Sequence, residues 1–385
     1  MGWEVWPMKR TVELELIHRA LAALEERRPD EGERSTLAIR RYLDAERLER
    51  ELALLRRRPV AAAHASELGE PGAFLRRELY GVPALLTRDE EGRVQGFLNS
   101  CRHRGTQLVD AEAGCARRFS CPYHGWTYGL DGSLKGVPHA GGFPGLDRAD
   151  LGLHTLPTCE AHGLIWVVPT ASEEAIDVDD WLGPLSADLA GLHLGELVPY
   201  APEVRRWAAN WKLLAEGGLE TYHFRQTHAE SIFPLFPDNL FVADVFGAHI
   251  RSVILKRSLA ELRSQPEEAW RLREHANVLY SLFPTTVLLV QDEHVEWIHW
   301  APTAVNETVV HITPLVPPPQ DAAAEAYWAR HRALTVSTLA EDFEIAASIQ
   351  RGMHFRPTGQ VHLGTFEYLL GQFNQTLETE LEMGC

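Results

Sequence analysis

Hydrophobic positions follow two different periods along this chain. Residues 8–27 and 44–58 carry apolar side chains at helical spacing, and Pro29 lies in the break between them. From Val82 onward the pattern changes to short alternating stretches typical of β-strands, which continue to the apolar run at 164–169. The amino-terminal segment is therefore predicted to be helical, and the segment after it all-β.

The second half of the chain predicts several strands and one long helix. Apolar, strand-like runs occur at residues 249–257, 285–291, 294–301 and 307–315. A helix is predicted over about 322–351, where Leu339, Phe343 and Ala346 recur at helical spacing and would bury one side. We therefore expect an antiparallel sheet that curls around one long helix.

Two short loops in the predicted all-β segment combine cysteine and histidine. The first reads Cys101-Arg-His103-Arg-Gly, and the second reads Cys121-Pro-Tyr-His124-Gly-Trp. Two thiolates and two imidazoles are the ligands of a Rieske [2Fe–2S] centre, with the cysteines on one iron and the histidines on the other. Zinc accepts the same ligands, but zinc fingers usually pair Cys with Cys and His with His. Because each loop supplies one of each, the [2Fe–2S] cluster is favoured.

A second candidate metal site lies within residues 210–228, where His223 and His228 follow Glu216 and Glu220. Two histidines and a carboxylate on one face of an iron leave positions open for oxygen and substrate. Five residues correspond to about 500° of helix rotation, so a straight helix would not direct both histidines to one metal. We expect a helix that carries both glutamates and His223 and that ends or bulges before His228.

Asp342 is the candidate for the third ligand. It adjoins the apolar side of the predicted 322–351 helix and can face inward, where an unpaired carboxylate would be costly without a cation. Glu341 is the alternative ligand, and Glu344 is expected to be a solvated charge.

On these residues the chain resembles the oxygenase (alpha) component of Rieske non-haem iron oxygenases, the ring-hydroxylating oxygenase family. Respiratory Rieske proteins carry an additional pair of cysteines where this chain has Thr106 and Tyr123. The resemblance implies an α+β fold, in which an all-β Rieske [2Fe–2S] domain is inserted before a helix-grip (START-like) antiparallel-sheet catalytic domain. It implies N-terminal helices packing on the catalytic domain at 1–57, the Rieske domain at 58–172 and the mononuclear iron domain at 173–385.

The resemblance also implies a role for each candidate residue. It makes four residues the ligands of the cluster: Cys101, His103, Cys121 and His124. It makes His223, His228 and Asp342 the ligands of a mononuclear Fe(II). Glu220, three residues before the first of these histidines, would be the bridge for electron transfer between subunits. Such a bridge implies a cyclic homotrimer, in which the cluster of one subunit lies next to the iron of its neighbour.

The activity implied by the resemblance is oxidation with O2. Electrons from NAD(P)H would arrive through a reductase, with or without a ferredoxin, and a small organic substrate would be hydroxylated or oxidatively demethylated. The Glu-Thr-Tyr-His form at 220–223 resembles oxygenases that act on carnitine and related compounds. The alternative is an aromatic ring-hydroxylating dioxygenase. An electron-transfer protein with a non-functional second site is a third hypothesis, against which the complete His-His-Asp set argues.

The substrate pocket is expected between the metal helix and the curved sheet. Seven residues are candidates for its wall, with ordinary core packing as the alternative for each: Leu214, Gly217, Gly218, Phe224, Leu289, Gln291 and Trp297. Two glycines inside a helix cost about 1 kcal/mol each relative to alanine. Gly217 and Gly218 would therefore either create room beside the iron or admit close packing of another element.

Composition restricts the partners and the compartment. A net charge of −17 argues against nucleic-acid binding. No apolar run is long enough to span a membrane, and the first residues lack a signal pattern, so no membrane partner is expected. Five cysteines, two of them assigned to the cluster, do not form a disulfide framework, which predicts a reducing cytoplasm. Four arginines near the loops form either a docking face for an acidic electron donor or ordinary surface charge: Arg102, Arg104, Arg117 and Arg118.

Overall fold

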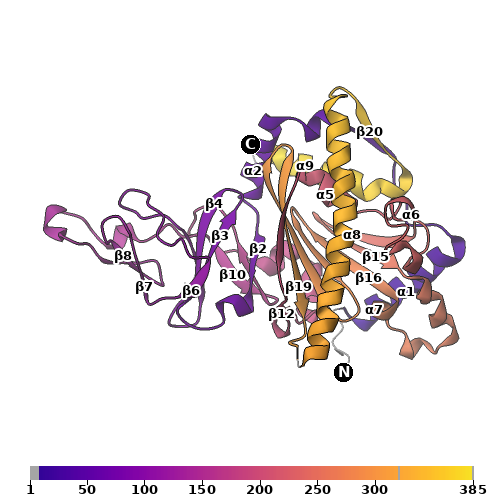
Figure 1. Cartoon of the computed structure of the whole chain (residues 1–385), viewed down its shortest axis with the longest axis horizontal. Coiled ribbons are helices and arrows are strands. Elements are labelled where there is room, and N and C mark those ends of the chain that lie inside the picture. Colours follow the sequence, from indigo (N-terminus) through magenta and orange to yellow (C-terminus); the bar gives the residue numbers. More distant parts are fainter. Residues whose placement is uncertain (1–7, 320, 384–385) are drawn as a thin grey trace. The chain divides into compact units, whose positions relative to one another are not determined.

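The computed structural model describes residues 8–319 and 321–383. The chain forms two compact units, whose elements are drawn in Figure 1. The smaller unit comprises residues 55–181 and 194–196, and the larger unit comprises the described residues up to 54, residues 182–193 and those from 197 onward. Within the part of the chain that the structure describes, no helix has both the length and the apolar character needed to cross a membrane.

Three small antiparallel sheets make up the smaller unit. The first contains, in spatial order, β10 (Thr158–Ala161), β11 (Leu164–Val167) and β2 (Val60–His64). The second contains β5 (Val94–Leu98), β4 (Val82–Arg88), β3 (Ala73–Leu79) and β6 (Ala113–Cys115). The third contains β7 (Arg118–Ser120), β8 (Thr127–Gly129) and β9 (Leu134–Gly136). The prediction of short strands in this segment is confirmed.

The second and third sheets of the smaller unit share one buried core. Phe74, Phe97 and Tyr128 belong to it, and so do the loop residues Cys101 and Cys121. Because large aromatic side chains bury much apolar surface, they dominate the energetics of a small core. The two Cys–His loops therefore begin inside rigid packing.

One eight-stranded antiparallel sheet dominates the larger unit. Its strands, in spatial order, are β12 (Val198–Pro199), β19 (Glu307–Val316), β18 (Val295–Ala304), β17 (Thr286–Val290), β16 (Ala276–Leu282), β15 (His249–Leu255) and β14 (Phe241–Phe246), and β13 (Glu203–Trp207) also pairs with β19. The four strands predicted in this half are present, whereas β12, β13, β14 and β16 were not predicted. A separate pair joins β1 (Ser35–Ala38) to β20 (Gln360–Leu363).

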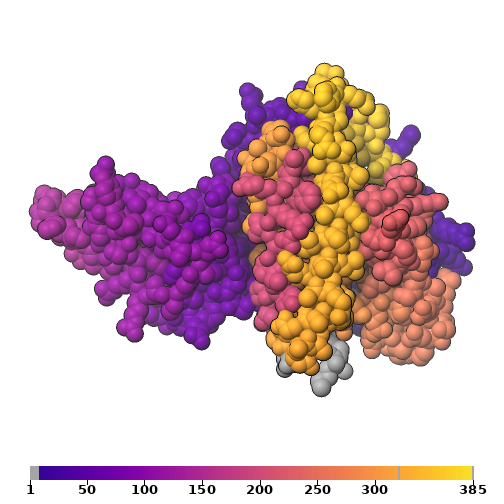
Figure 2. All heavy atoms as spheres, in the orientation of Figure 1, coloured from indigo at the N-terminus to yellow at the C-terminus, as the bar shows by residue number. Residues whose placement is uncertain are grey.

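The long helix α8 (Ala322–His354) crosses one face of this sheet (Figure 1). It begins at Asp321, whose side chain accepts hydrogen bonds from the second and third N–H groups after it. Phe343 fixes the helix against the sheet, because its ring packs against Trp207 at 5.3 Å and Trp300 at 5.8 Å between ring centroids. The expected sheet with one long helix is confirmed. The outer face of α8 is uncovered in Figure 2.

Shorter helices complete the larger unit. They include α1 (Arg10–Glu26), α2 (Ala45–Leu55), α4 (Leu185–Gly191), α5 (Trp211–Gly217), α7 (Leu272–His275) and α9 (Tyr368–Met383). Lys212 of α5 and Glu51 of α2 form a fully buried ion pair, with Nζ 2.8 Å from both carboxylate oxygens. Since loss of either partner would leave an uncompensated buried charge, this pair holds α5 in place.

Candidate metal centres

The two Cys–His loops of the smaller unit repeat one backbone pattern. The N–H of Cys101 and of Cys121 each donates to the carbonyl five residues later, at 2.8 Å in both loops. The carbonyl of each cysteine accepts from a glycine four residues later, Gly105 at 2.8 Å and Gly125 at 3.0 Å. Both glycines have positive φ, 78° and 73°, a conformation that side chains disfavour. The matched turns present one cysteine and one histidine from each loop.

The histidines of the two loops lie together. The ring centroids of His103 and His124 are 4.7 Å apart, and His103 stacks on Trp126 with the rings within 7° of parallel. Nδ1 of His103 is buried and has no hydrogen-bond partner among the residues that the structure describes. An orphaned buried nitrogen is costly, and coordination to iron would satisfy it.

The cysteines are buried beside each other, and their environment favours the thiolate. Burial works against charge on Cys121, but the backbone N–H groups of Tyr123 and His124 and the neighbouring Cys101 outweigh burial and lower its pKa. The hydroxyl of Tyr128 lies 3.4 Å from Sγ of Cys101. The thiolate is the form that binds a metal, so these contacts suit an iron ligand.

The four loop side chains do not surround a single point. Among the described residues, one group of three or more His, Cys, Asp or Glu side chains has its ligand atoms within 4.8 Å of one another, and it contains none of these four. A zinc site would need all four ligand atoms at about 2.0–2.3 Å from one ion. A cysteine pair beside a histidine pair fits the two irons of a [2Fe–2S] cluster.

The group that does converge is His223, His228 and Asp342 of the larger unit, here called the triad. Nε2 of His223 lies 3.3 Å from Oδ1 of Asp342, and Nε2 of His228 lies 2.9 Å from the same oxygen. Two imidazoles and one carboxylate directed at one point are the ligand set of a non-haem iron site with open positions.

The expectation of one helix carrying Glu216, Glu220 and His223 is wrong. Helix α5 begins after Asn210, whose side chain caps it, and ends at Gly217, before Glu220. The poor helix propensity of two consecutive glycines accounts for this end. A single turn, α6 (Phe224–Thr227), then lies between the two histidines, one at each end of it. The sharp turn brings both rings close to Asp342.

In each histidine of the triad, the ring nitrogen that does not face Asp342 contacts a carboxylate. Oε1 of Glu220 lies 2.5 Å from Nδ1 of His223, and Oε2 of Glu341 lies 2.6 Å from Nδ1 of His228. Because a carboxylate only accepts hydrogen bonds, Nδ1 carries the proton in both rings and Nε2 faces the triad centre. Sequence reasoning singled out Glu220, but it treated Glu341 as an alternative ligand. The structure places Glu341 behind His228 instead.

In the metal-free triad, the contacts between the carboxylates and the imidazoles shift the pKa values of all three groups. Burial disfavours the imidazolium of His223, but its hydrogen bonds to Asp342 and Glu220 outweigh burial and raise its pKa to about 10. Burial lowers the pKa of His228 and its hydrogen bond to Asp342 raises it, and the net result is a raised pKa. The pKa of Asp342 is lowered, because the two histidines outweigh its burial. The carboxylates therefore favour positive charge at this point, which a metal cation would supply.

A cleft of ≈ 760 Å³ opens beside the triad, here called the triad cleft. His223, Asp342, Glu220 and Glu216 line it together with apolar side chains of α8 and β20. Gly217 also lines it, and a side chain at this glycine would meet no atom within 4 Å. The glycine therefore leaves open space beside the triad.

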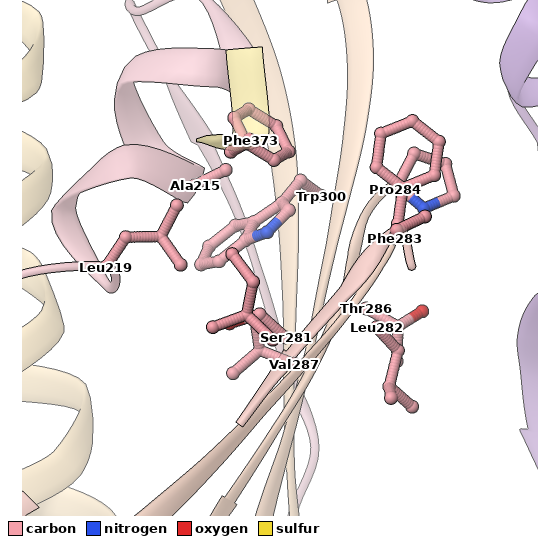
Figure 3. A pocket seen from close by; sticks show the side chains of 12 residues that line it. Ala215, Leu219, Ser281, Leu282, Phe283, Pro284, Thr286, Val287, Trp300 and Phe373 are labelled. Atoms are coloured by element: carbon pink, nitrogen blue, oxygen red, sulfur yellow. The ribbon is translucent and has the colours of Figure 1, made fainter. Parts of the chain in front are cut away.

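A smaller pocket of ≈ 320 Å³ lies between α5 and the sheet (Figure 3). Phe283, Trp300 and Phe373 contribute aromatic rings, and none of the described residues that line it is charged. This is the expected place, but none of the seven candidate wall residues lines it. Trp297 and Trp300 illustrate the reason, because residues three apart on a strand point to opposite faces.

Comparison with known proteins agrees with this arrangement. The model of the Rieske [2Fe-2S] domain matches residues 58–157, and that of the ring hydroxylating alpha subunit (catalytic domain) matches residues 194–382. The chain belongs to the ring-hydroxylating Rieske oxygenase alpha-subunit family. Membership implies a Rieske cluster and a mononuclear iron, and systems of this family typically draw electrons from NAD(P)H through a reductase.

Curated relatives include both dioxygenase and monooxygenase components. The large oxygenase component of a 2,4-dinitrotoluene dioxygenase system from Burkholderia sp. (strain RASC) is 36% identical over 49% of this chain and 43% of its own length. The oxygenase subunit of a glycine betaine monooxygenase from Pseudomonas aeruginosa (strain UCBPP-PA14) is 34% identical over 44% of this chain and 39% of its own. The matched part thus spans less than half of each relative.

Solved structures share the fold over most of the chain. A quaternary ammonium Rieske monooxygenase in complex with L-carnitine superposes with a TM-score of 0.75 at 21% identity, covering 90% of this chain and 95% of that one. A naphthalene 1,2-dioxygenase with indole in its active site gives a TM-score of 0.72 at 22% identity, covering 91% and 94%. At these identities the likeness establishes the fold.

Proposed function

We propose that this protein is a Rieske-type oxygenase. It would use O2 and electrons from NAD(P)H, delivered by a reductase with or without a ferredoxin, to hydroxylate or oxidatively demethylate a small organic substrate. The observation that carries the proposal is the presence of two different ligand sets in one chain, the Cys–His loops and the triad. A cluster supplies electrons one at a time, and a three-ligand iron leaves positions for dioxygen and substrate.

The proposed cluster ligands are Cys101, Cys121, His103 and His124, supported by the paired loops and the orphaned Nδ1 of His103. The proposed ligands of the iron are the triad residues. Their support is convergence on one point and the proton on each Nδ1, which directs Nε2 toward the metal.

Glu220 is the proposed bridge for electrons arriving from a second copy of the chain. Its carboxylate contacts His223 and lines the triad cleft, so it can accept a hydrogen bond from a histidine outside. The cluster loops carry Arg102 and Arg104, and Tyr123 beside them is 55% exposed. Basic loops would complement the acidic Glu220 and Glu367 of the cleft.

A head-to-tail contact of this kind can close into a ring, and we propose the cyclic homotrimer that the family resemblance implies. One Rieske monooxygenase with the same fold, TM-score 0.75 at 21% identity over 98% of this chain and 99% of its own, is described in terms of inter-subunit electron transfer. The four described cysteines are all free, which fits the reducing cytoplasm as the compartment.

A second candidate is the oxidation of an aromatic ring, for which the pocket of Figure 3 has a suitable lining but no triad residue. Three aromatic side chains and several aliphatic ones line it, and no carboxylate does. Aromatic rings can also receive a quaternary ammonium group, but a buried charge without a counter-ion is costly. An uncharged apolar group therefore suits this lining better than a cation.

Single turnover under isotopically labelled dioxygen tests the activity. The reduced protein is exposed to the gas with arenes and, separately, with quaternary amines such as carnitine. We expect labelled oxygen in a hydroxylated product, or release of an aldehyde where the substrate is demethylated. His223→Ala should retain the reduced cluster and form no product, and product formation by this variant would contradict the proposal.

Mixed oligomers test the path between subunits. Chains carrying Cys101→Ser lack the cluster, and chains carrying His223→Ala lack the iron site. Each should be inactive alone, and co-expression should restore turnover, because a neighbour supplies the missing centre. Failure of assembled mixtures to regain any turnover would contradict electron transfer between subunits.

A further inference from the structure

Glu216 is a buried carboxylate of the triad cleft that neither proposed metal site uses. It lies in α5, seven residues before His223, and is only 7% exposed. It nevertheless lines the same cleft as Glu220, His223 and Asp342. A buried carboxylate at this place needs an explanation, because burial of an unpaired charge is costly.

Only one of the two carboxylate oxygens is engaged by the protein. Oε1 of Glu216 accepts hydrogen bonds from the hydroxyl of Tyr42 at 2.8 Å and from Nδ2 of Asn374 at 2.7 Å. Among the described residues, none donates a hydrogen bond to Oε2. A proton on Oε2 would therefore break no existing contact, and it would be held at the cleft.

The surroundings favour the neutral carboxyl group near neutral pH. Burial outweighs the hydrogen bonds from Asn374 and Tyr42 and the charges of Lys212 and Arg41, and it raises the pKa of Glu216 to about 7. Lys212 is already paired with Glu51, which limits its effect on Glu216. The charged and titratable groups around Glu216 are Arg41 and Tyr42 of the 3₁₀ helix η1 (Ile39–Tyr42), Lys212 of α5, and Glu220, His223, Asp342 and Glu367 of the cleft.

We propose that Glu216 is a proton-holding residue of the triad cleft, which carries a proton on Oε2 in the metal-free protein and releases it when a cation binds at the triad. This inference rests on the proposed triad. The physical reason is that a divalent cation nearby favours the charged form of a carboxyl group, so metal binding is coupled to proton release.

The proposal gives Glu216 a place in the reaction. Insertion of one oxygen atom into a C–H bond converts RH, O2, two electrons and two protons into ROH and water, so protons must reach the cleft together with electrons. In the metal-loaded protein Oε2 of Glu216 is ionised, so it would accept a proton that enters the cleft and pass it on to the reaction, returning to the ionised form. If Glu216 only fastened η1 to α9, a neutral glutamine would serve equally well.

Calorimetry counts the protons without any turnover. Protein with an intact cluster and no metal at the triad is titrated anaerobically with Fe(II) in two buffers of different ionisation enthalpy. Near pH 6, the native chain should release about 0.9 more protons per metal than Glu216→Gln, and the difference should vanish toward about pH 8.5. Glu307→Gln, which alters an exposed carboxylate already paired with Arg206, should release as many protons as the native chain.

Two results would overturn the assignment. Equal proton release by the native chain and Glu216→Gln is one. The other comes from Tyr42→Phe, which removes a hydrogen bond that favours the charged form and should move the release profile to higher pH. An unmoved profile contradicts the proposal even if Glu216→Gln does not fold.

Failure of the native chain to bind metal would instead contradict the triad. A titrating infrared band of a protonated carboxyl group, absent from Glu216→Gln, would then still test Glu216.

Discussion

Nδ1 of His228 lies 2.6 Å from Oε2 of Glu341, while Nε2 of the same ring lies 2.9 Å from Oδ1 of Asp342. Two adjacent acidic residues of α8 thus act on opposite sides of one imidazole. One carboxylate is directed at the triad centre, and the other fixes the tautomer and orientation of the ring. The hydroxyl of Ser231 also donates to Oε2 of Glu341, at 2.7 Å, which fixes this carboxylate in turn.

Substitution of Glu341 should weaken metal binding. Glu341→Gln replaces a charged acceptor with a neutral amide, which lowers the basicity of His228, and we expect the affinity to fall on the order of 10–100-fold. Anaerobic titration with Fe(II) or Co(II) measures the effect. Glu344→Gln alters an exposed carboxylate on the same helix and should bind like the native chain. Native affinity in Glu341→Gln would contradict the assignment.

Metal affinity should rise with pH. His223 must lose a proton before Nε2 can coordinate, and its pKa of about 10 means that binding displaces this proton across the neutral range. The apparent affinity should therefore increase about tenfold per pH unit between about pH 7 and 9 for each proton displaced. Binding that does not change with pH would show that His223 is not a ligand.

The same shift predicts how the stability of the metal-free protein depends on pH. Because the pKa of His223 is raised on folding, the folded chain holds the proton more tightly than the unfolded chain does. The contribution of protonated His223 to the free energy of unfolding is fully present below about pH 6.5 and is lost as the pH rises through about 10. Thermal unfolding of the metal-free protein should reveal this loss, and His223→Asn should diminish it.

Tyr128 should raise the reduction potential of the cluster. Its buried hydroxyl lies 3.4 Å from Sγ of Cys101, and it accepts the N–H of Arg102, which leaves its proton for the sulfur. A hydrogen bond to a sulfur ligand favours the more negative, reduced cluster. Tyr128→Phe should lower the potential by about 40 mV, since a hydrogen bond contributes about 1 kcal/mol. A redox titration that gives the native potential would contradict this role, and Tyr123→Phe is the exposed control.

Glu220 should be needed for electron transfer even when the iron site is filled. Glu220→Gln keeps the shape of the side chain and removes the charge that contacts His223. Fe(II) in excess offsets the weaker binding expected from the loss of this carboxylate, so both metal sites should be loaded, while reoxidation of the reduced cluster in a single turnover should slow on the order of 100-fold. Glu367→Gln changes a second carboxylate of the same cleft and is the matched control. Normal coupled turnover of Glu220→Gln would exclude the bridge.

The fold could be predicted wherever its signal is local. The long helix was placed at 322–351 and is found at Ala322–His354, because its periodic apolar face and the cap at Asp321 act over a few residues. The Cys–His loops were identified for the same reason, since each ligand pair lies within four consecutive residues.

The orientation of side chains could not be predicted. The apolar side of the 322–351 helix predicted Asp342 as the inward-facing carboxylate, but it did not predict that the neighbouring Glu341, about 100° away on the helix, would contact Nδ1 of His228. The wall of the pocket depends on the faces that the strands bury, so Trp300 lines it and Trp297 does not. The sequence predicted a helix that continues to His223, but the two glycines end α5 at Gly217.

The iron and acid-labile sulfide content of anaerobically purified protein, together with its electron paramagnetic resonance spectrum, shows whether the chain holds both metal centres. A Rieske cluster and a mononuclear iron together give about three irons and two sulfides per chain and a Rieske signal on reduction. His223→Ala should lose about one iron and keep the signal. Zinc without sulfide in the native chain would contradict the cluster, and two irons with two sulfides would contradict the second site.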